Sequence, residues 1–133
     1  QLMRRVTQHY DLELAKAGLK TTQYSLLSHV LKMAPVWPGE LARAMTMDAS
    51  TLTRNLRPLL DQGLVALGAD LADARVRRAL ITAKGGAAFV DAMPYWRVAL
   101  GFVNRTLGEA DAGALHDWMD LVTPAFRADP SEP

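Results

Sequence analysis

The sequence predicts a mainly α-helical fold of the winged helix-turn-helix class, with a two-stranded wing. Two observations predict it. Apolar residues recur at three- and four-residue steps along most of the chain, as they do in amphipathic helices. In addition, a short helix and a longer one are followed directly by two apolar segments that flank a polar turn, and such segments are typical of a β-hairpin.

Composition limits the class of protein. The chain has 133 residues, 50% of them hydrophobic and 22% charged, which indicates one compact globular domain. Its longest apolar runs are short and interrupted by charges, so we expect no membrane span, no secretory leader and no membrane partner. The absence of cysteine excludes a disulfide framework and a thiolate zinc site within these residues. These features favour a cytoplasmic protein.

The first two helices are predicted from their apolar stripes. In residues 1–17 the stripe consists of Leu2, Val6, Tyr10, Leu14 and Ala17. Gly18 ends this helix, because glycine readily adopts the left-handed conformation found at helix C-termini. Thr21 or Thr22 can cap the next helix, whose stripe consists of Tyr24, Leu27, Val30 and Leu31.

The third and fourth helices form the predicted helix-turn-helix. Pro35 and Pro38 leave room for only a brief extended segment between them. Pro38 suits the first turn of a short helix at 39–45, and Asp48 is a good N-cap for a fourth helix that runs to about Gln62. The fourth helix has an apolar face of Leu52, Leu56, Leu59 and Leu60. The opposite face is polar and consists of Ser50, Arg54, Arg57 and Asp61.

A hairpin and two further helices complete the chain. Gly63 ends the fourth helix, residues 64–67 and 76–82 are the predicted strands, and residues 68–75 form the polar turn between them. We expect a long helix at 83–107 with a kink at Pro94, because proline removes a helical hydrogen bond. A last helix is expected at 109–126, and the tail at 127–133 is expected to fray.

The second helix of the helix-turn-helix can enter the major groove of DNA. Its candidate DNA contacts are Ser50, Thr51, Thr53, Arg54 and Arg57. Hydroxyl groups can approach phosphates or base edges closely, and an arginine can offer two parallel donors to guanine. The free amides at the helix N-terminus also attract phosphate. The alternative interpretation is an ordinary solvated face on a packed helix.

The turn of the hairpin is rich in arginine. Arg75, Arg77 and Arg78 repel one another unless they meet an anion, and Asp73 can hold one of them in a forked ion pair. An arginine at a hairpin tip can enter a narrow minor groove. Residues 43–84 carry seven basic and four acidic groups, which suits a nucleic-acid face in the middle of the chain. The alternative is a charged hairpin that keeps a sheet edge soluble.

These segments together resemble the multiple-antibiotic-resistance regulator (MarR) family of transcriptional regulators over nearly the whole chain. The resemblance is carried by residues 19–27, 40–42, 49–54, 62–65, 73–75 and 81–85. It implies a homodimer that is paired through its terminal helices and binds a palindromic double-stranded DNA operator. It also implies a repressor that usually releases the DNA when a small molecule binds. We therefore expect a single MarR-like domain over 1–133, with dimerisation helices at 1–20 and 84–127 and a DNA-binding lobe at 21–83.

By position in this family, Ser50, Thr51, Thr53 and Arg54 would be recognition-helix contacts, Arg75 the wing-tip arginine and Asp73 its positioning partner. Two positions depart from the family pattern. Pro58 lies inside the recognition helix, where it removes a backbone bond to residue 54, so we expect a bend near residues 54–58 that affects the role of Arg57. Ala66-Leu67 replaces a strand end that is often basic in the family.

The resemblance also suggests sites for an effector and for dimerisation. A small aromatic or amphipathic effector would bind near His9, Tyr10, Met33 and Trp37. The alternative for these residues is ordinary core or interface packing. The dimer interface is assigned to Leu2, Val6, Trp96 and Trp118.

Other function classes find less support in the sequence. His9, His29 and His116 lack the spacing of a ligand pair, and no nucleophile elbow, phosphate loop or carboxylate dyad is present. We therefore expect no metal, no cofactor and no enzymatic activity. The remaining rival is a winged-helix protein-interaction module without DNA binding, and the basic wing disfavours it.

Overall fold

The computed structural model describes the backbone of residues 2–69, 72, 73, 75 and 77–122, and the side chains of these residues except 2, 3, 107 and 109–122. Helices α1 (Leu2–Leu14), α2 (Thr21–Met33), α3 (Pro38–Ala44) and α4 (Ala49–Asp61) come first, with a short 3-10 helix at Ala15–Ala17 after α1. Strands β1 (Val65–Ala69) and β2 (Arg77–Ile81) follow, and helix α5 (Ala83–Val122) comes last. This mainly helical architecture with a two-stranded antiparallel wing confirms the predicted fold class.

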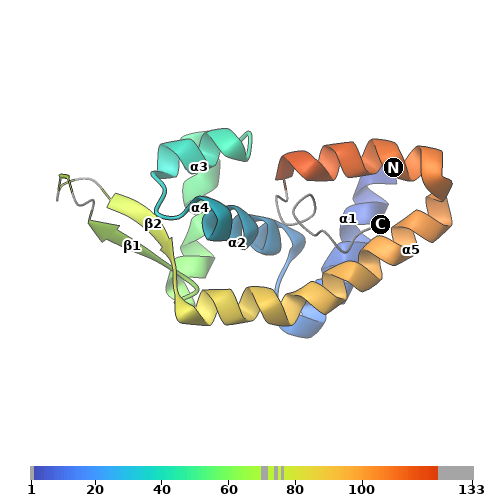
Figure 1. Ribbon diagram of the computed structural model, residues 1–133, viewed down its shortest axis with the longest axis horizontal. Helices are drawn as coiled ribbons and strands as arrows, with labels where there is room; N and C mark the ends of the chain where they lie inside the picture. Colours follow the sequence, from blue (N-terminus) through green and yellow to red (C-terminus); the bar gives the residue numbers. More distant parts are fainter. Residues whose placement is uncertain (1, 70–71, 74, 76, 123–133) are drawn as a thin grey trace.

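The elements gather into two regions of an elongated molecule (Figure 1). Helices α2, α3 and α4 form one region with the hairpin, and α1 packs with the later part of α5 in the other. The first part of α5 runs along the edge of the helix-turn-helix region and links the two. The hairpin projects beyond α3 at the far end of the molecule.

The start of α2 is capped from α1. The backbone N–H of Thr21 donates to Oδ1 of Asp11 at 2.7 Å, and the N–H of Lys20 donates to Oε1 of Gln23 at 2.9 Å. The sequence placed this cap on Thr21 or Thr22, but α2 begins at Thr21 itself. Gly18 ends the preceding 3-10 helix with a φ of 79°, as predicted.

The extended segment between the two prolines joins the hairpin. Val36 and Ala79 exchange two backbone hydrogen bonds, with N···O distances of 3.1 and 2.7 Å. Val36 therefore adds one residue of β-structure to the outer side of β2, whose other side pairs with β1 from Val65↔Ile81 to Ala69↔Arg77. This contact fixes the segment that leads directly into α3.

Helix α5 contains a break at Gly108, where φ is 76° and ψ is 170°. The break separates the two helices that the sequence predicted at 83–107 and 109–126. Pro94 lies inside the helix. Figure 1 shows that α5 changes direction between its yellow and orange parts. The predicted tail at 127–133 lies outside the described residues.

Glycine is required where α5 meets β1. A Cβ atom on Gly85 would clash with the carbonyl oxygen of Leu64, whose carbonyl carbon would stand only 2.8 Å away. The Thr82 hydroxyl accepts from the Gly85 N–H at 2.9 Å, and its oxygen lies 2.7 Å from the carbonyl oxygen of Gly63. Lys84 Nζ donates to the Gln62 carbonyl at 2.8 Å. The start of α5 is thereby tied to the end of α4.

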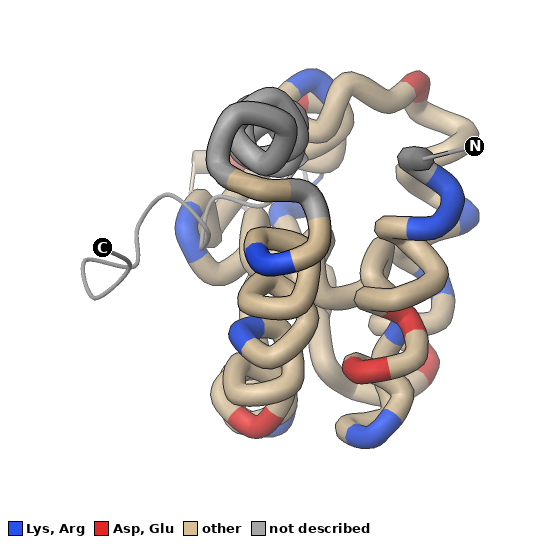
Figure 2. The backbone as a smooth tube through the Cα atoms, turned by 90° about the vertical axis from the view of Figure 1, so that its right-hand side faces the viewer, with Lys and Arg blue, Asp and Glu red and all other residues tan. Residues whose placement is uncertain are grey.

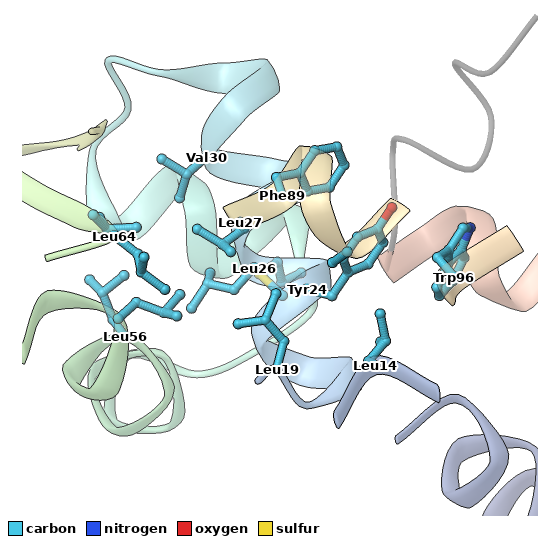
Figure 3. Close-up of a cluster of buried hydrophobic side chains, with 14 of the residues drawn as sticks. Leu14, Leu19, Tyr24, Leu26, Leu27, Val30, Leu56, Leu64, Phe89 and Trp96 are labelled. Carbon is cyan, nitrogen blue, oxygen red and sulfur yellow. The ribbon is translucent and has the colours of Figure 1, made fainter. Parts of the chain in front are cut away.

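A stack of aromatic rings joins the two regions. Figure 3 shows Tyr24 of α2 between Phe89 and Trp96 of α5, with ring centroids 4.7 and 5.0 Å apart. Tyr10 of α1 also packs against Trp96, with ring centroids 4.5 Å apart. Trp96 is 4% exposed within a single chain, so its burial does not agree with the interface role that the sequence suggested. Buried aromatic rings of this kind dominate core energetics.

Candidate nucleic-acid interface

The N-terminus of α4 is held by a carboxylate cap. Oδ1 of Asp48 accepts from the Thr51 N–H at 2.7 Å and from the Ser50 hydroxyl at 2.9 Å. The hydrogen bond from the Thr51 backbone, followed by those from the Ser50 and Thr51 hydroxyls, holds the pKa of Asp48 below its ordinary value. The predicted N-cap is confirmed, and it fixes the first turn of the helix.

The predicted polar face of α4 is exposed. Ser50, Thr53, Arg54 and Arg57 are exposed, whereas Leu52, Leu56 and Leu59 are buried on the other side of the helix. This division agrees with the faces predicted from the spacing of the residues. Thr51 is half-buried and lies at the edge of the exposed face.

Two hydroxyls of this face are engaged within the helix. Nη2 of Arg54 donates to Oγ1 of Thr51 at 3.3 Å, so the guanidinium lies over the first turn of α4. The Thr53 hydroxyl donates to the Ala49 carbonyl at 2.9 Å, which occupies the only hydrogen that this hydroxyl can donate. Arg54 is exposed and uses only part of its N–H donors in this contact, so it is the main donor that the first two turns of the face can offer to a partner.

Pro58 does not end the recognition helix. Helical geometry continues from Ala49 to Asp61, and the helix is capped at Gln62. Proline has no N–H to offer the carbonyl of Arg54, so the helical hydrogen bond between these two residues cannot form. Arg57 remains on the exposed face beside this proline.

The turn between α3 and α4 contains a residue in the left-handed region. Thr46 has a φ of 55°. Its N–H donates to the Arg43 carbonyl at 3.2 Å, and the N–H of Met47 donates to the Ala42 carbonyl at 2.9 Å. These two bonds form a Schellman motif, in which glycine is the usual residue at the left-handed position. The tight turn sets the direction in which α4 leaves α3.

The wing carries the predicted ion pair. Nε and Nη2 of Arg75 donate to Oδ1 and Oδ2 of Asp73 at 3.2 and 3.3 Å, and the Arg75 N–H donates to Oδ1 at 3.0 Å. Hydrogen bonds from the Arg75 side chain and then from its backbone hold the pKa of Asp73 below the ordinary value. The Arg75 side chain is nevertheless 91% exposed, so its charge is presented to solvent.

The other two wing arginines differ in their surroundings. Arg77 begins β2 and is exposed. Arg78 is half-buried, its Nη1 donates to the Pro35 carbonyl at 3.3 Å, and its Cζ lies 4.5 Å from the centre of the Trp37 ring. The sequence grouped the two residues, but Arg78 is engaged with the segment before α3.

The four residues suggested for an effector site lie in different surroundings. His9 stacks on Phe102 with ring centroids 4.1 Å apart, and Tyr10 is 1% exposed in the core. Met33 packs against the core at the end of α2, whereas Trp37 contacts Arg78 near the wing. His9 and Trp37 therefore belong to different regions of the molecule.

Apolar side chains are exposed at the end of the molecule formed by α1 and α5. Figure 2 views this end, where the two helices run side by side with acidic and basic residues dispersed along them. Leu12 is 69%, Val98 55% and Phe102 45% exposed. Of the residues assigned to dimerisation, Val6 is buried in the core, and the side chains of Leu2 and Trp118 lie outside the described ones.

Within the part of the chain that the structure describes, no group of three or more His, Cys, Asp and Glu side chains is placed to hold a metal ion. None of the helices in these described residues has the length and apolar character needed to cross a membrane.

The sequence and the fold match transcriptional regulators. A model of the MarR family matches residues 17–76, whereas no curated protein matches the sequence. The structure of the M. tuberculosis transcriptional regulator MosR in complex with DNA is 34% identical, with a TM-score of 0.75, and the match covers 96% of this chain and 92% of MosR.

Two more distant structures share the fold. A mutant of MarR from E. coli complexed with operator DNA is 19% identical with a TM-score of 0.77, and the match covers 88% of this chain and 84% of that one. CouR from Rhodococcus jostii RHA1, bound to p-coumaroyl-CoA, is 22% identical with a TM-score of 0.73, and the match covers 99% and 90% of the two chains.

Proposed function

Because the chain belongs to the MarR family of transcriptional regulators, we propose that it is a sequence-specific repressor that binds a palindromic operator as a homodimer and leaves it when a small molecule binds. Helix α4 would lie in the major groove and the wing tip in the adjacent minor groove. Two copies would place their recognition helices about 34 Å apart, one turn of the DNA helix.

The observation that carries this proposal is the capped, exposed face of α4. Asp48 holds the first turn, Thr51 supports Arg54, and Arg54 and Arg57 point away from a buried leucine face. A preorganised arginine loses less conformational entropy on binding, and its donors match O6 and N7 of guanine. The DNA complexes of MosR and of the E. coli protein, which share this fold, support a DNA partner.

The wing would supply a second contact with DNA, in the minor groove rather than in the major groove. Arg75 is 91% exposed and is steered by Asp73, which suits insertion into a narrow, electronegative minor groove. Arg77 adds a second exposed positive charge next to it. These two residues would add affinity and salt dependence, whereas α4 would supply most of the base discrimination.

Dimerisation is proposed to use the α1 and α5 end, so that 1–20 and 84–127 serve dimerisation and 21–83 serves DNA. The exposed Leu12, Val98 and Phe102 support this arrangement, because a second copy would remove their apolar surface from water. Trp96 and Val6 would act only indirectly, by supporting these helices from the core.

The effector is proposed to be a small aromatic or amphipathic molecule. CouR, which shares the fold, binds p-coumaroyl-CoA. Of the residues suggested by sequence, His9 stays the better candidate, because its ring stacks on the half-exposed Phe102 and its Nε2 is buried without a hydrogen-bond partner. Trp37 packs on Arg78 in the other region of the molecule, so we do not place it in one site with His9. We propose no enzymatic activity.

Selection of bound duplexes from a randomised pool, followed by sequencing, tests the proposed function. Enrichment of a palindrome with half-sites one helical turn apart is the expected result. Failure to retain any duplex at low salt would contradict it and would leave a protein-interaction module as the function to test. An enriched duplex would also allow effectors to be screened by their ability to release it.

A further inference from the structure

The wing needs support from the rest of the molecule to hold a fixed direction. A two-stranded hairpin is marginally stable by itself. Figure 1 shows the hairpin projecting beyond α3, so a small rotation at its base displaces its tip by a larger amount. The contacts that the outer side of β2 makes with the segment before α3 therefore decide where Arg75 lies relative to α4.

Arg78 lies near the turn end of β2 and connects this strand to the segment before α3. It lies in β2 opposite Gly68, next to Ala79, whose two backbone bonds to Val36 hold the strand on the segment before α3. The Arg78 guanidinium continues this contact with side-chain atoms: Nη1 donates to the Pro35 carbonyl at 3.3 Å, and Cζ lies 4.5 Å from the Trp37 ring centre.

Trp37 in turn is fixed at the start of α3. Its backbone N–H donates to Oε1 of Glu40 at 3.2 Å, and Pro38 follows it as the first residue of the helix. Trp37 is 43% exposed, so the guanidinium contact leaves the residue partly open to solvent. A cation over a tryptophan ring is a favourable pair even at a partly exposed site.

We propose that Arg78 is a positioning residue for DNA binding. It acts without touching DNA: its clamp on Pro35 and Trp37 fixes the wing on the helix-turn-helix, so that Arg75 meets the minor groove while α4 lies in the major groove. The inference rests on the proposed function, and it separates Arg78 from Arg75 and Arg77, with which the sequence grouped it.

The first variant is Trp37→Leu, which removes the ring without changing any charge and keeps the backbone bond to Glu40. Loss of one partly exposed cation–π contact should weaken binding of the enriched duplex by about threefold to tenfold. The dependence of log Kd on log salt should not change, because no phosphate contact is lost. In an Arg75→Gln background the same substitution should cost less than about twofold, because its effect passes through Arg75.

The second variant is Arg78→Gln, with Arg105→Gln in α5 as the control for loss of one exposed positive charge. Arg78→Gln should lower the salt slope no more than the control does. In a double-mutant cycle the losses caused by Arg78→Gln and Trp37→Leu should be less than additive, because the two residues share the cation–π contact while the bond to the Pro35 carbonyl belongs to Arg78 alone. Arg75→Gln should lower the slope by about one. If Arg78→Gln lowers the salt slope by about one, and does so in the Arg75→Gln background as well, Arg78 contacts DNA and the inference is overturned.

Trp37→Phe keeps an aromatic face and should restore most of the affinity lost in Trp37→Leu. If Trp37→Leu does not fold, Trp37→Phe and Arg78→Gln carry the test, with thermal unfolding as the check that each is intact. If the losses of DNA affinity caused by the Trp37 and Arg75 variants are strictly additive, the positioning role of Arg78 is refuted while the proposed function stands. A wild-type chain that binds no duplex would refute the proposed function, and this inference with it.

Discussion

The guanidinium of Arg75 is paired with the carboxylate of Asp73 through two nitrogens, at 3.2 and 3.3 Å, and yet it is 91% exposed. An ion pair so exposed contributes little to folding stability. The pair instead fixes the orientation of the Arg75 side chain, because the two bonds hold the guanidinium plane at one angle beside the backbone of the turn. We interpret the pair as a device that orients a wing-tip arginine for an anionic surface.

Two substitutions at Arg75 distinguish the contribution of its positive charge to DNA binding from that of its planar guanidinium. Arg75→Ala should weaken binding to all duplexes and lower the salt slope by about one. Arg75→Lys should keep the slope but lose preference for sequences with a narrow minor groove, since lysine lacks the planar fork. Titrations of duplexes with different flanking sequences at several salt concentrations measure both effects. Equal behaviour of the two variants would argue against minor-groove insertion.

Arg54 is expected to read particular base pairs. Arg54→Ala should reduce discrimination at those positions by about 1–3 kcal/mol, while affinity for unrelated duplexes falls much less. Arg57→Ala is the matched control, one turn further along the same face. Competition titrations with single-base variants of the enriched duplex give the measurement. Equal losses on every sequence would remove the base-reading role of Arg54.

Thr53 is expected to contribute its methyl group rather than its hydroxyl, because the hydroxyl hydrogen is donated to the Ala49 carbonyl. Thr53→Val keeps the methyl and should change the affinity for the enriched duplex by less than about threefold, whereas Thr53→Ser should weaken it by more if the methyl packs on a thymine. The reverse order of the two affinities would show that the hydroxyl contacts DNA.

Alanine substitutions at two adjacent glycines at the start of α5 should change the free energy of unfolding in opposite directions. Gly85→Ala places a Cβ against the Leu64 carbonyl and should lower the free energy of unfolding by about 1–3 kcal/mol. Gly86→Ala meets no atom within 4 Å. It should raise the free energy of unfolding by about 0.5–1 kcal/mol, because alanine is the better helix former. Urea unfolding of both variants tests this, and a neutral Gly85→Ala would contradict the close approach.

The cap on α4 predicts a pH dependence. The folded pKa of Asp48 lies below its ordinary value of 3.8, so the cap contributes stability above pH 3.8, and this contribution is lost as the pH falls through the folded pKa. Asp48→Asn can still accept the Thr51 N–H but does not titrate, so its stability should fall less steeply with acid. The unfolding midpoints of the two proteins between about pH 5 and about pH 2 provide the comparison. Parallel curves would exclude a titrating cap.

The sequence predicted those features that depend on neighbours along the chain. Helix ends at Gly18 and Gly63, the Asp48 cap and the polar face of α4 all follow from local propensity and from a 3.6-residue period. The Asp73–Arg75 pair lies two residues apart and was predicted for the same reason.

Features that depend on distant segments could not be predicted in this way. The cap of Thr21 comes from Asp11 ten residues earlier, and Gly85 is required by a carbonyl of Leu64 across the joint between β1 and α5. Arg78 looked like another wing charge because its partners, Pro35 and Trp37, are about forty residues away in the chain. Trp96 looked like an interface residue because its partners Tyr10 and Tyr24 lie on other helices.

Equilibrium binding of the wild-type protein to the enriched palindrome and to a scrambled duplex of equal composition, at two salt concentrations, tests the central claim most directly. A specific regulator should bind the palindrome at least about a thousandfold more tightly, with affinity that falls steeply as salt rises. Equal and weak binding to both duplexes, or none at low salt, would contradict a sequence-specific DNA-binding role for α4 and the wing.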